Sequence, residues 1–212
     1  MTDKNIFDTK NPFIQKVVSE LINEKQSETE KAIILYNYVR DNWYYSPLRI
    51  SLKEEDYQID YLVDRKKGHC IDKAIILITL LRAVNIKANL GLAKVQNHIA
   101  AEKVVAFLGT NVLVPHGYVD IFLNQKWVKA TPAFNDSLCE KIGVSPLEFN
   151  GLEDSIFQKF DASGTQFMEY IEDYGAFEEL PILLIEELLL THYPILKQFG
   201  LKIGTVIDAE QF

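Results

Sequence analysis

The stretch that decides the fold is Gly68-His69-Cys70-Ile71-Asp72, which leads into the apolar run Ala74-Ile75-Ile76-Leu77-Ile78-Thr79-Leu80-Leu81. Glycine permits the sharp turn that the chain needs before a helix, and a run that is apolar on nearly all sides is typical of a buried helix. The sequence therefore predicts a central helix that begins near Cys70. Because a helix N-terminus lowers the pKa of a nearby thiol, we expect Cys70 to be acidic and nucleophilic.

A histidine is placed to act with this thiol. His116 comes at the start of a segment, Tyr118 to Leu123, in which polar and apolar residues alternate as they do in a half-buried strand. A histidine at the end of a strand can reach a helix N-terminus that packs across from it. The pair predicts thiol–imidazole chemistry, although each residue taken alone could be structural, as a buried cysteine or a surface histidine.

Composition excludes several other classes of protein. The 212 residues carry a net charge of −8, which argues against nucleic acid or an anionic membrane as a partner. The two cysteines, Cys70 and Cys139, form no disulfide framework, and the N-terminus lacks an apolar signal core, so we expect a cytoplasmic protein. Zinc-site spacings, phosphate-binding glycine loops and the serine-hydrolase motif Gly-x-Ser-x-Gly are absent from the sequence, and we therefore expect no metal or cofactor.

The order of the periodic segments predicts one α+β domain over residues 1–212, with a core at about 28–136 and a helical C-terminal extension at about 145–212. Asn11-Pro12 and the capping box Ser27-Glu28-Thr29-Glu30 each indicate the start of a helix. Alternating patterns then predict the strands, of which the last two are joined by a turn at 124–126. The expected strands are 88–95, 104–108, 118–123, 127–130 and, more weakly, 202–207.

Taken in order, several motifs resemble those of the transglutaminase-like superfamily of papain-fold cysteine enzymes. This resemblance implies a cysteine-bearing helix packed on an antiparallel sheet that carries the histidine, with Cys70 as nucleophile and His116 as general base. It implies acyl transfer from a carboxamide or peptide bond of a protein or peptide substrate, with hydrolase or peptidase activity as the expected outcome. The motifs are Tyr38-Val39-Arg40-Asp41-Asn42-Trp43-Tyr44-Tyr45, Lys67-Gly68-His69-Cys70-Ile71-Asp72, Leu80-Leu81-Arg82-Ala83-Val84-Asn85, Pro115-His116-Gly117-Tyr118-Val119-Asp120 and Lys126-Trp127-Val128-Lys129-Ala130-Thr131-Pro132.

The residue that orients the histidine departs from the family pattern. The family usually has an aspartate where this chain has Thr131, and a hydroxyl stabilises an imidazolium less than a carboxylate does. Asn135 and Asp136 follow closely and are alternatives, while Trp43 is a candidate oxyanion donor or else a core tryptophan. The missing aspartate also leaves open an alternative function, in which a weak or inactive family member uses the cleft to bind a protein or peptide.

Overall fold

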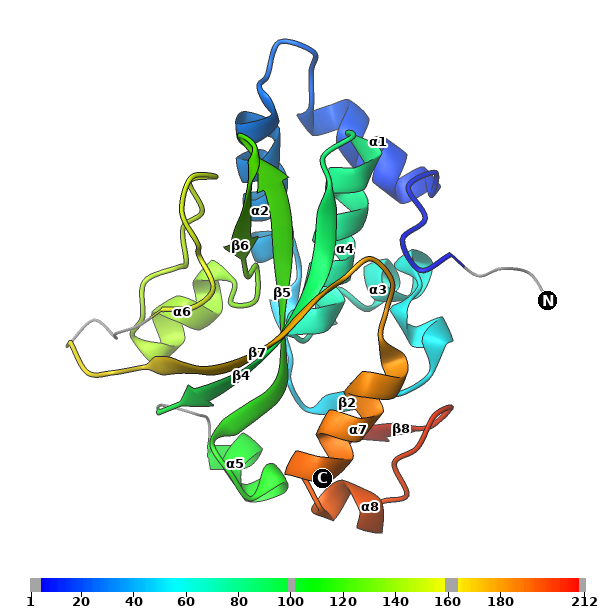
Figure 1. Ribbon diagram of the computed structural model, residues 1–212, viewed down its shortest axis with the longest axis vertical. Coiled ribbons are helices and arrows are strands. Elements are labelled where there is room, and N and C mark those ends of the chain that lie inside the picture. The colour runs from blue at the N-terminus through cyan, green and yellow to red at the C-terminus, as the bar shows by residue number, and fades with distance from the viewer. Residues whose placement is uncertain (1–4, 99–101, 159–163, 210–212) are drawn as a thin grey trace.

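The central sheet contains four antiparallel strands in the order β6-β5-β4-β7 (Figure 1). The computed structural model describes residues 5–98, 102–158 and 164–209. The pairing of β5 with β6 is regular, whereas β4 has one register shift against β5 and two against β7. The strands are β4 (Ala88–Asn97), β5 (Val112–Leu123), β6 (Lys126–Ala130) and β7 (Met168–Phe177).

Three helices cover one face of this sheet. The helix α4 (Cys70–Ala83) packs directly on β4 and β5, and α1 (Pro12–Leu21) and α2 (Glu28–Asn42) pack against α4. Every residue of α4 from Cys70 to Leu81 is buried, which is why its sequence is apolar all round. The predicted central helix and the two predicted N-terminal caps are therefore confirmed, with the Asn11 and Ser27 side chains accepting backbone N–H groups.

The other elements surround the sheet and close the end of α4 where Cys70 lies. The helix α7 and the strand β8 lie together beside β2 at one end of the molecule (Figure 1), where β2 and β8 pair antiparallel. No helix within the described residues is both long and apolar enough to cross a membrane. The elements that surround the sheet are β1 (Tyr44–Tyr45), β2 (Arg49–Ser51), the 3-10 helix η1 (Glu54–Tyr57), α3 (Ile59–Arg65), β3 (Lys67–Gly68), α5 (Glu102–Leu108), α6 (Asp136–Ile142), α7 (Ile182–His192), α8 (Ile195–Gln198) and β8 (Val206–Asp208).

Two predictions of secondary structure are wrong. Residues 104–108, expected to be a strand, belong to the helix α5, because the short run Val104-Val105-Ala106-Phe107-Leu108 fits a one-sided helix as well as a strand. The segment after residue 145, expected to be helical, contains the helices α7 and α8 but also supplies the strand β7, which pairs with β4. β7 is mostly exposed, so its sequence lacks the apolar alternation that marks a half-buried strand. The predicted hairpin is confirmed, with Asn124 and Gln125 both at positive φ between β5 and β6.

The start of α4 approaches β5 so closely that only glycine fits between them. A Cβ atom built on Gly117 would lie 2.7 Å from the Ile71 side chain and 2.9 Å from the Ile71 backbone. Since backbone atoms of a packed helix cannot move aside cheaply, any larger residue would push the two elements apart. Gly117 thus sets the distance between the strand that carries His116 and the helix that carries Cys70.

Candidate active site at the start of the central helix

Cys70 is the first residue of α4, and His69 is its cap. The His69 Nδ1 accepts the backbone N–H groups of Ile71 at 3.1 Å and Asp72 at 3.5 Å, while the Asp72 carboxylate accepts the His69 N–H at 3.1 Å. This reciprocal capping box uses a histidine where serine or threonine is usual. Because Nδ1 is an acceptor, the proton of this neutral imidazole lies on Nε2. His69 therefore fixes the helix start on which the thiol stands.

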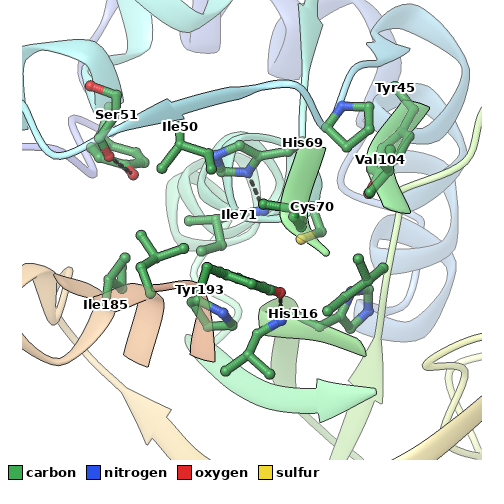
Figure 2. A pocket seen from close by; sticks show the side chains of 17 residues that line it. Tyr45, Ile50, Ser51, His69, Cys70, Ile71, Val104, His116, Ile185 and Tyr193 are labelled. Carbon is green, nitrogen blue, oxygen red and sulfur yellow. Dashed lines mark hydrogen bonds between the residues drawn. The ribbon is translucent and has the colours of Figure 1, made fainter. Parts of the chain in front are cut away.

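Cys70 and His116 line the same pocket, which has a cavity volume of about 80 Å³ (Figure 2). The Cys70 sulfur accepts a hydrogen bond of 3.2 Å from the backbone N–H of Gly117, the residue after His116. No hydrogen bond within the described residues joins the thiol to either nitrogen of His116. The tertiary structure thus brings the two predicted residues to one pocket through the backbone of β5, without a direct hydrogen bond between their described side chains.

Burial decides the protonation state of the thiol. It raises the pKa of Cys70 to about 11, against the opposing effect of the Gly117 N–H, and the Asp72 carboxylate raises it further. The N–H groups of the first helical turn do lower the pKa, as the sequence leads one to expect, but their effect is smaller than the cost of removing the thiolate from water. The expectation of an acidic Cys70 is therefore wrong, because burial keeps the proton on the sulfur at neutral pH.

His116 is likewise buried and neutral. Burial lowers its pKa to about 4, with only a small opposing effect from the backbone of Ile156. Both ring nitrogens are buried without a hydrogen-bond partner among the described residues. Buried polar atoms in native proteins are almost always paired, and ring nitrogens that make no hydrogen bond of normal geometry are available to a reaction partner. A neutral imidazole is also the form that can accept a proton.

Thr131 lies on the other side of His116. Both residues line a second, narrow cavity of about 10 Å³, and His116 is the residue that this cavity shares with the pocket of Cys70. The Thr131 backbone is held by the Tyr36 hydroxyl at 3.1 Å and by Ser155 at 2.9 Å, whereas its own hydroxyl is buried without a partner in the part of the chain that the structure describes. The threonine at the predicted third position therefore lines the same cavity as the predicted base and makes no hydrogen bond through its hydroxyl to any described residue.

The two alternatives for the third position are engaged elsewhere. The Asn135 side chain accepts the Tyr45 N–H at 3.0 Å and donates to Ser137 at 2.7 Å. The Asp136 carboxylate is largely exposed and lies 3.5 Å from the Arg40 guanidinium. Neither residue lines the cavities that contain His116, so Thr131 is the candidate that the tertiary structure places beside the imidazole.

Among the upstream aromatic residues, Tyr45 lies at the pocket and Trp43 does not. The Trp43 indole is buried and donates to the carbonyl of Leu62 at 3.1 Å, which is the role of a core tryptophan. Tyr45 lines the pocket of Cys70, and burial followed by the neighbouring Cys70 raises its pKa well above the usual value. Its phenol therefore keeps its proton as an O–H donor. The sequence contained a signal for this residue, since it stands two positions after Trp43 in the same aromatic cluster.

A buried lysine supports the site from inside the protein. The Lys73 ammonium, one turn along α4 from Cys70, donates to the carbonyls of Arg40 at 2.8 Å, Trp43 at 2.8 Å and Ala133 at 2.7 Å. These bonds join the end of α2 and the segment after β6 to the start of α4. Burial lowers the pKa of Lys73 to about 7. Sequence reasoning missed this residue because a single lysine near a helix start is usually on the surface.

The comparison with protein families decides the affiliation. The family model described as the transglutaminase-like superfamily matches residues 15–132, which is more than half of the chain. The chain belongs to the transglutaminase-like superfamily. The matched residues include Cys70 and His116, and the mixed architecture of helices and antiparallel sheet is the one expected from this membership.

Two solved structures resemble this member of the transglutaminase-like superfamily at low identity. One is a "Putative Cysteine Protease" from Cytophaga hutchinsonii, with 15% identity, a TM-score of 0.42 and coverage of 79% of this chain and 49% of the other. The second is a "putative protease" from Parabacteroides distasonis ATCC 8503, with 16% identity, a TM-score of 0.41 and coverage of 63% and 28%. The chain thus spans half or less of the length of these proteins. The comparison with curated proteins found no match.

Proposed function

We propose that this protein is a cysteine hydrolase that cleaves a carboxamide or peptide bond by acyl transfer from a Cys70–His116 pair. The observation that supports the proposal most directly is the Gly117 N–H bond to the Cys70 sulfur, which holds the thiol beside the strand position of His116. The unpaired nitrogens of His116 provide a base with no competing partner among the described residues. Membership of the transglutaminase-like superfamily is consistent with these roles.

The reaction begins from a neutral thiol and a neutral imidazole. As the Cys70 sulfur bonds to the substrate carbonyl carbon, its proton passes to His116. The tetrahedral intermediate collapses, the carbon–nitrogen bond breaks, and His116 returns the proton to the leaving amine. Water then gives a proton to His116 and attacks the thioester carbon, and the sulfur leaves and regains its proton. No oxidant, reductant or cofactor is needed for this sequence.

We assign two donors to the negative oxygen of the intermediate. In the first turn of α4, the N–H groups of Ile71 and Asp72 are taken by His69, and that of Lys73 donates to the His69 carbonyl. We therefore assign the oxyanion contact to the backbone N–H of Cys70 and the hydroxyl of Tyr45. Removal of one such donor typically lowers kcat by about 10²–10³-fold, so Tyr45→Phe tests this part of the mechanism.

The experiment that tests the proposal is trapping of the acyl-enzyme. The full chain is incubated with activated esters and with peptide amides, and the Cys70 peptide is examined by mass spectrometry. We expect an acyl adduct on Cys70 in the natural protein and in Cys139→Ser, and none in Cys70→Ser. Cys139 is a matched control because it is also a buried free thiol. Absence of an adduct from every substrate, with the fold intact by circular dichroism, contradicts the proposal.

A second candidate function is peptide binding without turnover. It is favoured by one observation, which is that no aspartate or glutamate among the described residues lines either cavity that contains His116. An imidazolium formed during catalysis would then depend on the Thr131 hydroxyl alone. Cys70→Ala separates the two functions, since a binding module keeps its biological output in this variant and an enzyme loses it.

A further inference from the structure

The pocket beside Cys70 has an apolar wall that the acyl-transfer chemistry does not use. Ile50 of β2, Val104 and Leu108 of α5, and Ile185 and Leu189 of α7 contribute this wall (Figure 2). All five side chains are aliphatic and come from elements far apart in the sequence, and Ile50 is held in place by the pairing of β2 with β8. Such convergence of aliphatic groups next to a reactive residue is typical of a site that selects a side chain of the substrate.

Apart from Tyr45, Cys70 and His116, which the proposed reaction uses, the polar side chains of the same pocket are engaged within the protein. The Tyr57 hydroxyl donates to the Ser51 carbonyl at 2.7 Å, and the Ser51 hydroxyl donates to Asp56 at 2.6 Å. The Tyr193 hydroxyl donates to the Val112 carbonyl at 2.8 Å and accepts the Val114 N–H at 2.6 Å. A substrate side chain that carries a carboxamide or a charge would lose its water at this wall without gaining a partner from these engaged groups, which disfavours it.

The size of the cavity limits the aliphatic group that it can hold. Its volume is about 80 Å³, roughly half that of the engineered apolar cavity of about 150 Å³ that holds one benzene ring in another protein. By this comparison the pocket accommodates three or four carbon atoms rather than an aromatic ring. Valine and leucine side chains have that size.

From the lining, the engaged polar groups and the volume, we propose that this wall binds a small branched aliphatic side chain of the substrate, adjacent to the carbonyl that Cys70 attacks. The inference rests on the proposed function and names its substrate class. The protein then prefers valyl or leucyl amides to glutaminyl, charged or aromatic ones. The elements α5 and α7 act as determinants of specificity rather than as catalytic elements.

The first test compares kcat/KM for N-acetylated amides of glycine, valine, leucine, glutamine and phenylalanine. We expect valine and leucine to exceed glutamine and phenylalanine by at least about tenfold. Val104→Phe, which fills the wall, is expected to lower the leucine-to-glycine ratio of kcat/KM by a similar factor. Lys103→Phe is the matched control, because Lys103 is exposed on the same helix. Equal rates for leucine and glutamine, or an unchanged ratio in Val104→Phe, overturn the inference while leaving hydrolysis in place.

A second test does not depend on turnover. Cys70→Ala with labelled methyl groups is titrated with N-acetyl-leucine methylamide and with the glutamine analogue. We expect the leucine compound alone to shift the methyl signals of Val104, Ile185 and Leu189. Selective shifts together with no acyl-enzyme in the natural protein contradict the proposed hydrolase and leave the pocket assignment standing. Shifts of equal size from both compounds, or none from either, overturn the assignment itself.

Discussion

The backbone N–H of Gly117 donates a 3.2 Å hydrogen bond to the sulfur of Cys70. This bond joins a strand residue to a helix residue that is remote in sequence, and it exists because the missing side chain of Gly117 lets β5 touch the start of α4. The relationship sets where the thiol lies relative to the neighbouring His116. It also makes the geometry of the site sensitive to a single methyl group.

Gly117→Ala is expected to destabilise the protein by about 1–3 kcal/mol, because the added carbon would overlap both the side chain and the backbone of Ile71. The displaced helix start should also lower acylation of Cys70 by more than the loss of folded protein explains. Urea unfolding and acyl-enzyme trapping measure the two effects.

Gly91→Ala provides the matched control for this glycine. Its added carbon would lie 2.1 Å from the ring of its cross-strand neighbour Tyr118, which points away from α4 because successive strand residues alternate and Gly117 faces Ile71. We expect lost stability with normal acylation of the remaining folded protein. Normal acylation in Gly117→Ala as well would show that the close approach serves packing alone.

Alkylation of Cys70 is expected to be slow at neutral pH and to rise about tenfold per pH unit until the pH nears 11. The reason is that burial raises the pKa of Cys70 to about 11, so the thiolate fraction grows over that range. The rate of iodoacetamide labelling, read at Cys70 by mass spectrometry, tests this. Rapid labelling near pH 6 would instead indicate a preformed thiolate–imidazolium pair.

The activity of the neutral Cys70–His116 pair should persist well below neutral pH. Burial lowers the pKa of His116 to about 4, so the imidazole remains a base until the pH falls through that value, and kcat/KM should decline only below it. The pH profile of ester cleavage, with circular dichroism at each pH as a control for folding, measures the midpoint. A midpoint near the usual histidine value would mean that His116 is not buried in the active form.

Replacement of Thr131 separates its effect on stability from a role in orienting His116. Thr131→Val removes a buried hydroxyl that has no partner within residues 5–98, 102–158 and 164–209, so the free energy of unfolding should rise by about 1 kcal/mol. If the hydroxyl orients His116 during turnover, kcat should at the same time fall by roughly tenfold, and Thr131→Ser should restore it. Higher stability with unchanged kcat would remove Thr131 from the mechanism.

Lys73→Met is expected to destabilise the protein by about 3 kcal/mol, since three buried carbonyls lose their donor. Lys16→Met is the control, because Lys16 lies on the exposed surface of α1.

The stabilisation by Lys73 should also depend on pH. Burial lowers the pKa of folded Lys73 to about 7 from its unfolded value of about 10.5. The unfolded state therefore binds more protons between these values, and the stability of the natural protein relative to Lys73→Met should rise with pH across that window. If the difference in the free energy of unfolding between the natural protein and Lys73→Met stays constant from pH 7 to 10, the lowered pKa of Lys73 is contradicted.

Much of the fold could be predicted from local pattern. The caps at Asn11 and Ser27, the apolar helix after Cys70 and the turn at Asn124-Gln125 each depend on neighbouring residues, and each was predicted where the structure has it. The strand β7 and the helix α5 could not be predicted in this way. β7 is identified by its pairing with β4, and the apolar run in α5 was too short for its period to distinguish helix from strand.

The sequence by itself determined the chemical groups and their order along the chain, because a helix start, a strand and a family motif are read from adjacent residues. Only the tertiary structure decided which groups meet. It placed Thr131 beside His116, Asn135 on the backbone of Tyr45 and Trp43 in the core. It also reversed the expected acidity of Cys70, because the cost of burying a charge depends on everything packed around the sulfur and outweighs the helix start that the sequence reveals.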